Sequence, residues 1–166
     1  QVPSNYSSFY EFYLKDSNKK NKKTKFNNKV IHQSKILEYF NDKLNKKNTE
    51  KELNSLLQKI KKDKKYFVST KDTILLQSLK SDGVKILKKY ENFYNKTEAN
   101  IPYDIQILIN KNEIGLVLLR LVEIIGEDKV EDIDSENLYF IISILNQINA
   151  DKLRNRILLK VLPLKV

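Results

Sequence analysis

Apolar residues recur at intervals of three and four along most of the chain, which is the periodicity of amphipathic helices. The most apolar stretch covers residues 114–125 and is followed by Gly126. We expect a helix there that ends at this glycine, with the glycine in the left-handed αL conformation. Because the stretch is apolar nearly all round, we also expect neighbouring elements to bury it on more than one side.

Three further helices are predicted around this one. Pro102 suits the first turn of a helix, since its missing N–H would have no partner there. Asp134 or Ser135 caps a later helix that Asn149 stops, and Pro163 limits the last helix. The predicted core positions of this part are Val117, Leu118, Leu121, Ile125, Leu138, Ile141, Leu145, Leu153 and Ile157.

The first half of the chain predicts a helical hairpin. Residues 30–44 keep near-heptad apolar spacing, which indicates an amphipathic helix. Thr49 and Glu52 form a capping-box pattern that would start a second helix, whose inward residues would include Leu53 and Ile60. A connection this short favours antiparallel packing of the two helices.

A second capping signal follows this predicted hairpin. Ser69 and Asp72 predict the start of a helix over about 71–80, with Gly83 in its stop signal. Residues 84–94 continue with helical spacing and predict another short helix.

These elements predict an all-α protein. The chain contains three glycines and three prolines, which are too few for the turns of an all-β chain of this length. The spacing divides the chain into an aromatic segment plus Lys/Asn-rich linker (1–28), a basic helical hairpin (29–65) and a C-terminal helical array (66–166). No strict repeat is found, so we expect irregular hairpins in an α-solenoid-like array behind a partly flexible N-terminal segment.

Positive charge is concentrated in the first half of the chain. Residues 1–96 carry 23 lysines and 10 acidic residues, a net +13, whereas residues 97–166 carry 8 basic and 11 acidic residues, a net −3. Closely spaced ammonium groups can bind a polyanion, although such runs more often only solubilise a linker or helix end. The candidate polyanion contacts are Lys19, Lys20, Lys22, Lys23, Lys25, Lys59, Lys61, Lys62, Lys64 and Lys65.

An aromatic stripe lies near the start of the chain. Tyr6, Phe9, Tyr10 and Tyr13 have the spacing of one helical face. Such a stripe usually docks on a core, while stacking on bases is the alternative.

The sequence offers little that would carry catalysis. Cysteine is absent, so no thiolate nucleophile or sulfur metal site exists. His32 is the only histidine and has no triad-like pattern nearby, and the acidic run 127–136 lacks the alternating ligands of a calcium loop. Neither a Gly-rich phosphate loop nor a run of about 18 apolar residues is present. We therefore expect no enzyme activity, no cofactor, no metal and no small-molecule substrate.

Two stretches of the chain carry a resemblance to a known group of proteins. LLQSLKSDG at 75–83, and GLVLLRLVEIIGED, LYFIISILNQI and LRNRILLKVLPLKV within 115–166, are similar to the C-terminal part of uncharacterised alphaproteobacterial proteins that resemble long exported α-solenoids of the cell envelope. The resemblance implies a helical-repeat scaffold, the end of a larger polypeptide and a location in the periplasm or cell envelope. It implies no functional residue.

Two functional hypotheses follow. The first is a protein-interaction or structural scaffold whose partner is another protein or further repeats of the same polypeptide. The alternative is electrostatic binding to nucleic acid or anionic lipid through the lysine-rich first half.

Overall fold

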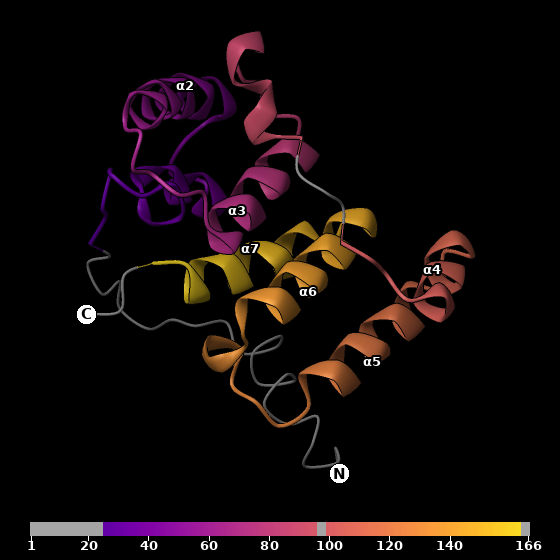
Figure 1. Cartoon of the computed structure of the whole chain (residues 1–166). Coiled ribbons are helices and arrows are strands. Elements are labelled where there is room, and N and C mark those ends of the chain that lie inside the picture. The colour runs from indigo at the N-terminus through magenta and orange to yellow at the C-terminus, as the bar shows by residue number, and fades with distance from the viewer. Residues whose placement is uncertain (1–24, 96–98, 164–166) are drawn as a thin grey trace.

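The chain folds as an all-α protein, as the sequence predicts (Figure 1). This computed structural model describes residues 25–95 and 99–163, and every regular element within these ranges is helical. The α-helices are α2 (Lys46–Lys62), α3 (Thr70–Ser81), α4 (Tyr103–Asn110), α5 (Ile114–Ile125), α6 (Ser135–Gln147) and α7 (Asp151–Val161). The 3-10 helices are η1 (Ile31–Gln33), η2 (Lys35–Asn41), η3 (Lys88–Phe93) and η4 (Val130–Asp132).

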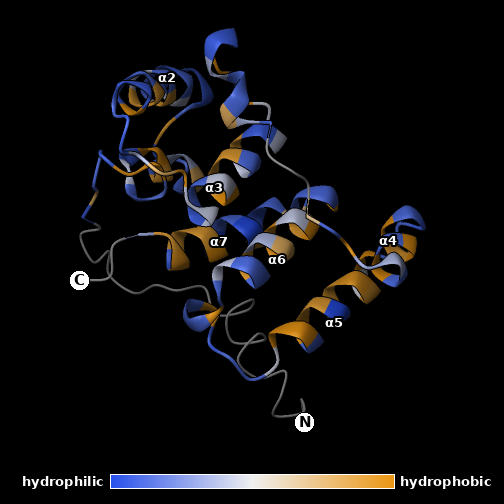
Figure 2. Ribbon diagram, in the orientation of Figure 1, coloured by the Kyte–Doolittle hydropathy of each residue, from blue (hydrophilic) through white to orange (hydrophobic). Residues whose placement is uncertain are grey.

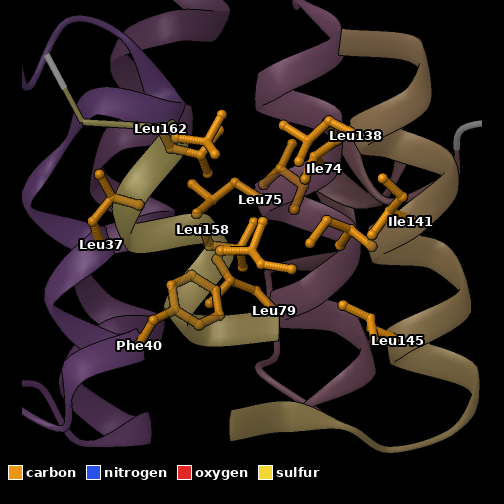
Figure 3. Close-up of a cluster of buried hydrophobic side chains, with 14 of the residues drawn as sticks. Leu37, Phe40, Ile74, Leu75, Leu79, Leu138, Ile141, Leu145, Leu158 and Leu162 are labelled. Carbon is orange, nitrogen blue, oxygen red and sulfur yellow. The ribbon is translucent and has the colours of Figure 1, made fainter. Parts of the chain in front are cut away.

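Helix α3 lies at the centre of the molecule. It packs along α6 and against η1, while α7 packs against both α6 and η2. Figure 3 shows Leu75 and Leu79 of α3 between Leu158 on one side and Leu145 on the other. One hydrophobic cluster therefore joins elements from both halves of the chain, from residue 31 to residue 162.

Local capping chemistry explains where two of these helices begin. The Ser69 hydroxyl accepts the N–H of Asp72 at 3.1 Å, and the Asp72 carboxylate accepts the N–H of Ser69 at 2.9 Å, so the predicted capping box is confirmed. At α6 the Asp134 carboxylate accepts the N–H groups of Glu136 and Asn137, at 2.9 and 3.0 Å. Both starts were predicted because a cap is a property of neighbouring residues.

The prediction of one α-helix over residues 30–44 is wrong. The segment forms η1 and η2, separated by Ser34, whose backbone is extended. The N–H of Ile31 is bound by the Tyr66 hydroxyl at 3.0 Å and the N–H of His32 by the Asp72 carboxylate at 2.9 Å. Tertiary hydrogen bonds thus hold the start of this segment, which is wound as a 3-10 helix, more tightly than an α-helix. Its apolar side chains are still buried.

The predicted capping box at Thr49 and Glu52 is also wrong. Helix α2 begins at Lys46, because the side chain of Asn45 accepts the N–H of Asn48 at 2.9 Å and caps the helix. Thr49 lies inside the helix, where its hydroxyl donates to the Asn45 carbonyl at 2.9 Å. The inward positions of α2 are confirmed: Leu53, Leu56, Leu57 and Ile60 are buried.

The short helix predicted over residues 84–94 is found in part, as η3. Tyr90 and Tyr94 are buried, and the Tyr94 hydroxyl donates to the carbonyl of Val84 at 2.9 Å. Leu87 is half-exposed instead, because it precedes η3 in an extended conformation that turns it away from the core.

Helix α5 has the predicted bounds but not the predicted burial. It packs with α4 as a hairpin at the edge of the molecule (Figure 1), so only one of its sides faces the core. Leu116 and Leu119 are each 48% exposed and Ile124 is 43% exposed. Gly126 has the expected positive φ of 60°, but its ψ of −134° lies outside the αL region. Of the predicted core positions Leu118 is half-buried and the other eight are buried.

Candidate interaction surfaces

A basic surface covers the C-terminal end of α2 and the turn after it. The candidate lysines in this region, Lys59, Lys61, Lys62, Lys64 and Lys65, are all exposed, and so is Lys25. Lys19, Lys20, Lys22 and Lys23 lie outside the described residues, as does the aromatic stripe at residues 6–13. Six of the ten candidate polyanion contacts therefore lie within the described residues, and all six are exposed to solvent.

The fold brings lysines that are distant in the sequence next to this run. The Lys61 ammonium donates to the carbonyl of Lys89 at 3.2 Å, although the two residues are 28 positions apart. The Nζ atoms of Lys61 and Lys89 lie 5.8 and 5.0 Å from the ring centroid of Tyr90, which is a distance suited to cation–π attraction. Lys88 and Lys89 thus extend the positive surface onto η3.

Phe67 lies on the loop between α2 and α3. Its side chain is 85% exposed. The preceding residue, Tyr66, is turned inward, because its hydroxyl donates to the Asp72 carboxylate at 2.9 Å and accepts the N–H of Ile31. Successive side chains of an extended segment point in opposite directions, and this alternation is the sequence signal that could have found the opposite orientations of the two rings.

An apolar surface lies on the outer side of α5. Figure 2 shows that apolar residues line most of this helix, whereas α2 alternates polar and apolar positions. Leu116, Leu119 and Ile124 point outward, and between them Arg120 donates to Glu123 at 2.8 Å. This surface was missed because the all-apolar pattern was interpreted as burial on several sides.

A buried polar network joins His32 to the start of α3. Nδ1 of His32 lies 2.7 Å from Oδ1 of Asp72, whose side chain is almost completely buried. The Ser69 hydroxyl is 3.4 Å from the same Nδ1. A histidine that acts as a general base binds its orienting carboxylate through one ring nitrogen and its nucleophile through the other. Here the carboxylate and the hydroxyl both lie next to the same nitrogen, Nδ1. The geometry suits a brace between η1 and α3.

Electrostatics support the ionised form of Asp72 in this network. Burial alone would raise the pKa of its carboxyl, but hydrogen bonds from the His32 side chain and from the N–H groups of Ser69 and His32 outweigh burial and lower it. Burial raises the pKa of the Tyr66 hydroxyl, and the Asp72 charge raises it further. The tyrosine is therefore neutral and donates to a carboxylate.

A second buried network ties α7 to the end of α3. Arg154 is fully buried and its guanidinium donates to both carboxylate oxygens of Asp82, each at 2.8 Å. The same guanidinium donates to Asn146 and Asn155, and it lies 5.7 Å from the ring centroid of Phe40. Such a bidentate pair, with the other donors satisfied, is the arrangement in which a buried arginine is tolerated.

Tyr39 lies at the edge of this second network. Burial, followed by the charge of Asp82 and a hydrogen bond to it, raises the pKa of the Tyr39 hydroxyl to about 12. The hydroxyl therefore remains protonated and donates to the same carboxylate that Arg154 binds.

The acidic run from Glu127 to Glu136 forms no metal site in the described part of the chain, where no group of three or more candidate ligand residues comes together. Asp134 is occupied by capping α6, and hydrogen bonds from Asn137 lower the pKa of its carboxyl. Lys160 forms an ion pair with Glu131 at 3.0 Å, which ties α7 to η4.

No protein-family model, curated protein or solved structure matches the chain. The resemblance to envelope α-solenoids therefore stays a prediction. Among residues 25–95 and 99–163, no helix has both the length and the apolar character needed to cross a bilayer.

Proposed function

We propose that the chain is a non-enzymatic protein-interaction module, an irregular α-solenoid-type array whose contact surface is the outer face of α5. The exposure of Leu116, Leu119 and Ile124 on one helix carries the proposal. At 100° per residue these three side chains fall on one side of α5, so together they form a patch. Adjacent exposed apolar side chains of this kind mark interaction sites more often than scattered ones do.

The partner that best suits this patch is a second copy of the chain. Leu119 and Ile124 are equally distant from the level between Leu121 and Val122, and so are Arg120 and Glu123. A two-fold axis at that level would pair each Leu119 with the partner's Ile124. It would pair each Arg120 with the partner's Glu123 at the same time. The patch is therefore self-complementary: apolar side chains meet apolar side chains, and each basic side chain meets an acidic one, as an isologous interface requires.

The proposed dimer is expected to be weak. One helix on each subunit buries less than the roughly 1,200 Å² of stable complexes. The Arg120–Glu123 pair must also exchange its partner within the helix for one across the interface. We therefore expect association that is reversible and rises with protein concentration.

Sedimentation velocity over a concentration series tests this proposal. The native chain should shift toward the dimer as concentration rises, and Leu119→Asp should remain a monomer. Leu87→Asp is the matched control, because Leu87 is a similarly exposed leucine that lies outside α5, at the start of η3. Arg120→Glu and Glu123→Arg should each weaken association, and the double variant should restore it. A native chain that stays monomeric, or a Leu87 variant that dissociates as fully, would overturn the proposal.

A second function is favoured by a different observation. The proximity of Lys61 and Lys89 supports electrostatic binding to an anionic surface, since it joins two stretches of exposed lysines. The ammonium groups of lysine lie at the end of flexible side chains. They therefore suit phosphates in variable positions better than phosphates in one fixed geometry.

The cellular setting rests on the resemblance alone. We propose that the chain is the end of a larger exported helical-repeat protein of the cell envelope. Further repeats of that polypeptide would then stack on this array, as successive repeats do in a solenoid.

A further inference from the structure

The corner between α2 and α3 combines one projecting aromatic ring with a high density of positive charge. Residues 59–67 contain five lysines and a single acid, Asp63. Phe67 has the largest exposed fraction of the bulky apolar side chains in the described ranges. Transfer of this ring from water into an apolar environment is favourable, so a partner that covers it would gain binding free energy.

The backbone of this corner is held in place. The Asp63 carboxylate accepts the N–H of Lys65 at 3.0 Å, and the Asp63 carbonyl accepts the N–H of Tyr66 at 3.1 Å. Tyr66 and Ser69 are bound to Asp72 on the far side of the loop. Phe67 is thus presented by a turn that is fixed at both ends. Binding of a ligand therefore costs little conformational entropy of this loop.

We infer that this corner is a membrane-docking site, in which Phe67 enters the interface of an anionic bilayer and the flanking lysines bind lipid phosphates. The inference rests on the second function proposed above and names its ligand. Interfacial anchoring combines a buried apolar group with attraction to anionic lipid, and both parts are present on one loop. Lys64 and Lys65 lie within three residues of the ring, so ring and charges reach the same surface.

Single-stranded nucleic acid fits these observations less well. Proteins that bind such strands present several aromatic rings along a basic groove, one for each successive base. Here Phe67 is the one exposed ring of the corner, because Tyr66 points inward and Tyr90 is buried under Lys61 and Lys89. An anionic lipid surface needs only one inserted ring.

Phe67→Trp provides a direct test, because the chain contains no tryptophan and the new residue is the only such fluorophore. The probes are vesicles of phosphatidylcholine with phosphatidylserine, and vesicles of phosphatidylcholine alone. Tyr103→Trp is the matched control, since Tyr103 is 81% exposed but precedes Asp104 in the acidic half. Both positions are exposed, so neither change should disturb the fold, which far-UV circular dichroism checks.

The expected result is a blue shift of the indole emission of Phe67→Trp on mixed vesicles, lost at high salt and absent with phosphatidylcholine alone. The emission of Tyr103→Trp should not shift. Phe67→Ala should lower affinity for mixed vesicles about tenfold, which is the order expected for one buried ring. Each of Lys64→Gln and Lys65→Gln should lower it about fivefold.

Three outcomes would overturn the inference, and they separate it from the function on which it rests. Vesicle binding by Phe67→Trp with an unshifted emission would leave electrostatic attachment standing and remove insertion. Absence of binding at low salt both to vesicles and to single-stranded DNA or RNA would remove insertion and electrostatic attachment together. An emission of the same variant that responds to single-stranded DNA or RNA but not to vesicles would assign the corner to nucleic acid.

Discussion

Helices α3 and α5 are of equal length, yet they are used in opposite ways. Helix α3 carries polar residues on several sides and is nevertheless the centre of the core, with Asp72, Thr73 and Ser78 all buried. Helix α5 is the more apolar of the two and lies at the edge with three large side chains exposed. The burial of a helix in this protein follows its place among its neighbours rather than its own hydrophobicity.

The polar residues of α3 are compatible with burial because each has a hydrogen-bond partner. Asp72 binds His32, Tyr66 and Ser69, and the Ser78 hydroxyl donates to the Ile74 carbonyl at 2.9 Å. Helix α5 has no such polar anchors on its outer side, apart from the pair Arg120–Glu123. The contrast separates a helix that holds the fold together from a helix that is available to bind.

The contrast is tested most strongly by placing a charge on each kind of surface. Leu75→Asp in α3 and Leu121→Asp on the inner side of α5 should each cost more than about 4 kcal/mol and unfold the chain, because both leucines are buried. Leu119→Asp, two residues from Leu121 but exposed, should change stability by about 0.5 kcal/mol or less. Urea denaturation followed by circular dichroism measures all three. Equal losses at positions 119 and 121 would contradict the assignment of the two sides of α5.

The link between α3 and α7 is expected to give the next largest effect. Arg154→Met leaves the Asp82 carboxylate without its bidentate partner and should cost about 3–5 kcal/mol. The double variant Arg154→Met with Asp82→Asn should recover part of the loss, since Asp82 is the more buried of the two carboxylates that Arg154 pairs with and is then uncharged. Arg156→Met, on the exposed side of the same helix, should cost less than about 1 kcal/mol. A single variant no less stable than the double variant would show that charge pairing is not the cause.

The Asp72 network should make stability depend on pH. The pKa of Asp72 is lower in the folded chain than its ordinary value of 3.8. Its stabilising contribution is therefore complete above that value and is lost as the pH falls through the folded pKa. Asp72→Asn should cost about 1–3 kcal/mol at neutral pH, and the difference from the native chain should narrow below pH 3.8. A difference that stays constant down to acid unfolding would rule out an ionised Asp72.

The two glycines at either end of α5 should give the smallest effects, with opposite signs. Gly115 lies in the first turn with open space around a Cβ position, so Gly115→Ala should stabilise the chain by up to about 1 kcal/mol. Gly126 has a φ of +60°, so Gly126→Ala should destabilise it by about 1 kcal/mol. Thermal denaturation of the two variants measures both shifts. The same sign for both would show that backbone conformation does not decide the outcome.

The sequence predicted those parts of the fold that depend on neighbouring residues. The bounds of α5, the capping box at Ser69 and the cap at Asp134 were all predicted, because a cap or an apolar run is written within a few positions. The start of α2 was misplaced by four residues, since Asn45 and Thr49 both carry capping side chains and only the local geometry chooses between them. The α-helix expected over 30–44 is interrupted at Ser34, whose backbone is extended. The contacts that hold this segment, from Tyr66 and Asp72 to the N–H groups of Ile31 and His32, come from residues more than 30 positions away and leave no local signal.

The features that pair distant residues could not be predicted in this way. His32 and Asp72 are 40 positions apart, and Asp82 and Arg154 are 72 apart. The exposure of the six described candidate lysines was implied by their charge, whereas the contact of Lys61 with Lys89 was not. The exposure of Leu116 and Leu119 was concealed by the very apolarity of α5, which indicates burial but does not specify on how many sides.

The packing of α7 on η2 has a consequence for biosynthesis. A ribosome makes η2 well before α7, and until α7 emerges Leu37 and Phe40 have no Leu158 to cover them (Figure 3). The segment that contains η2 therefore leaves the ribosome with open apolar surface, within the half of the chain that carries a net charge of +13. Nascent chains in this state are substrates for chaperones and are prone to aggregate. Helix α7 thus completes the core over η2, and these side chains are covered only after α7 has been synthesised.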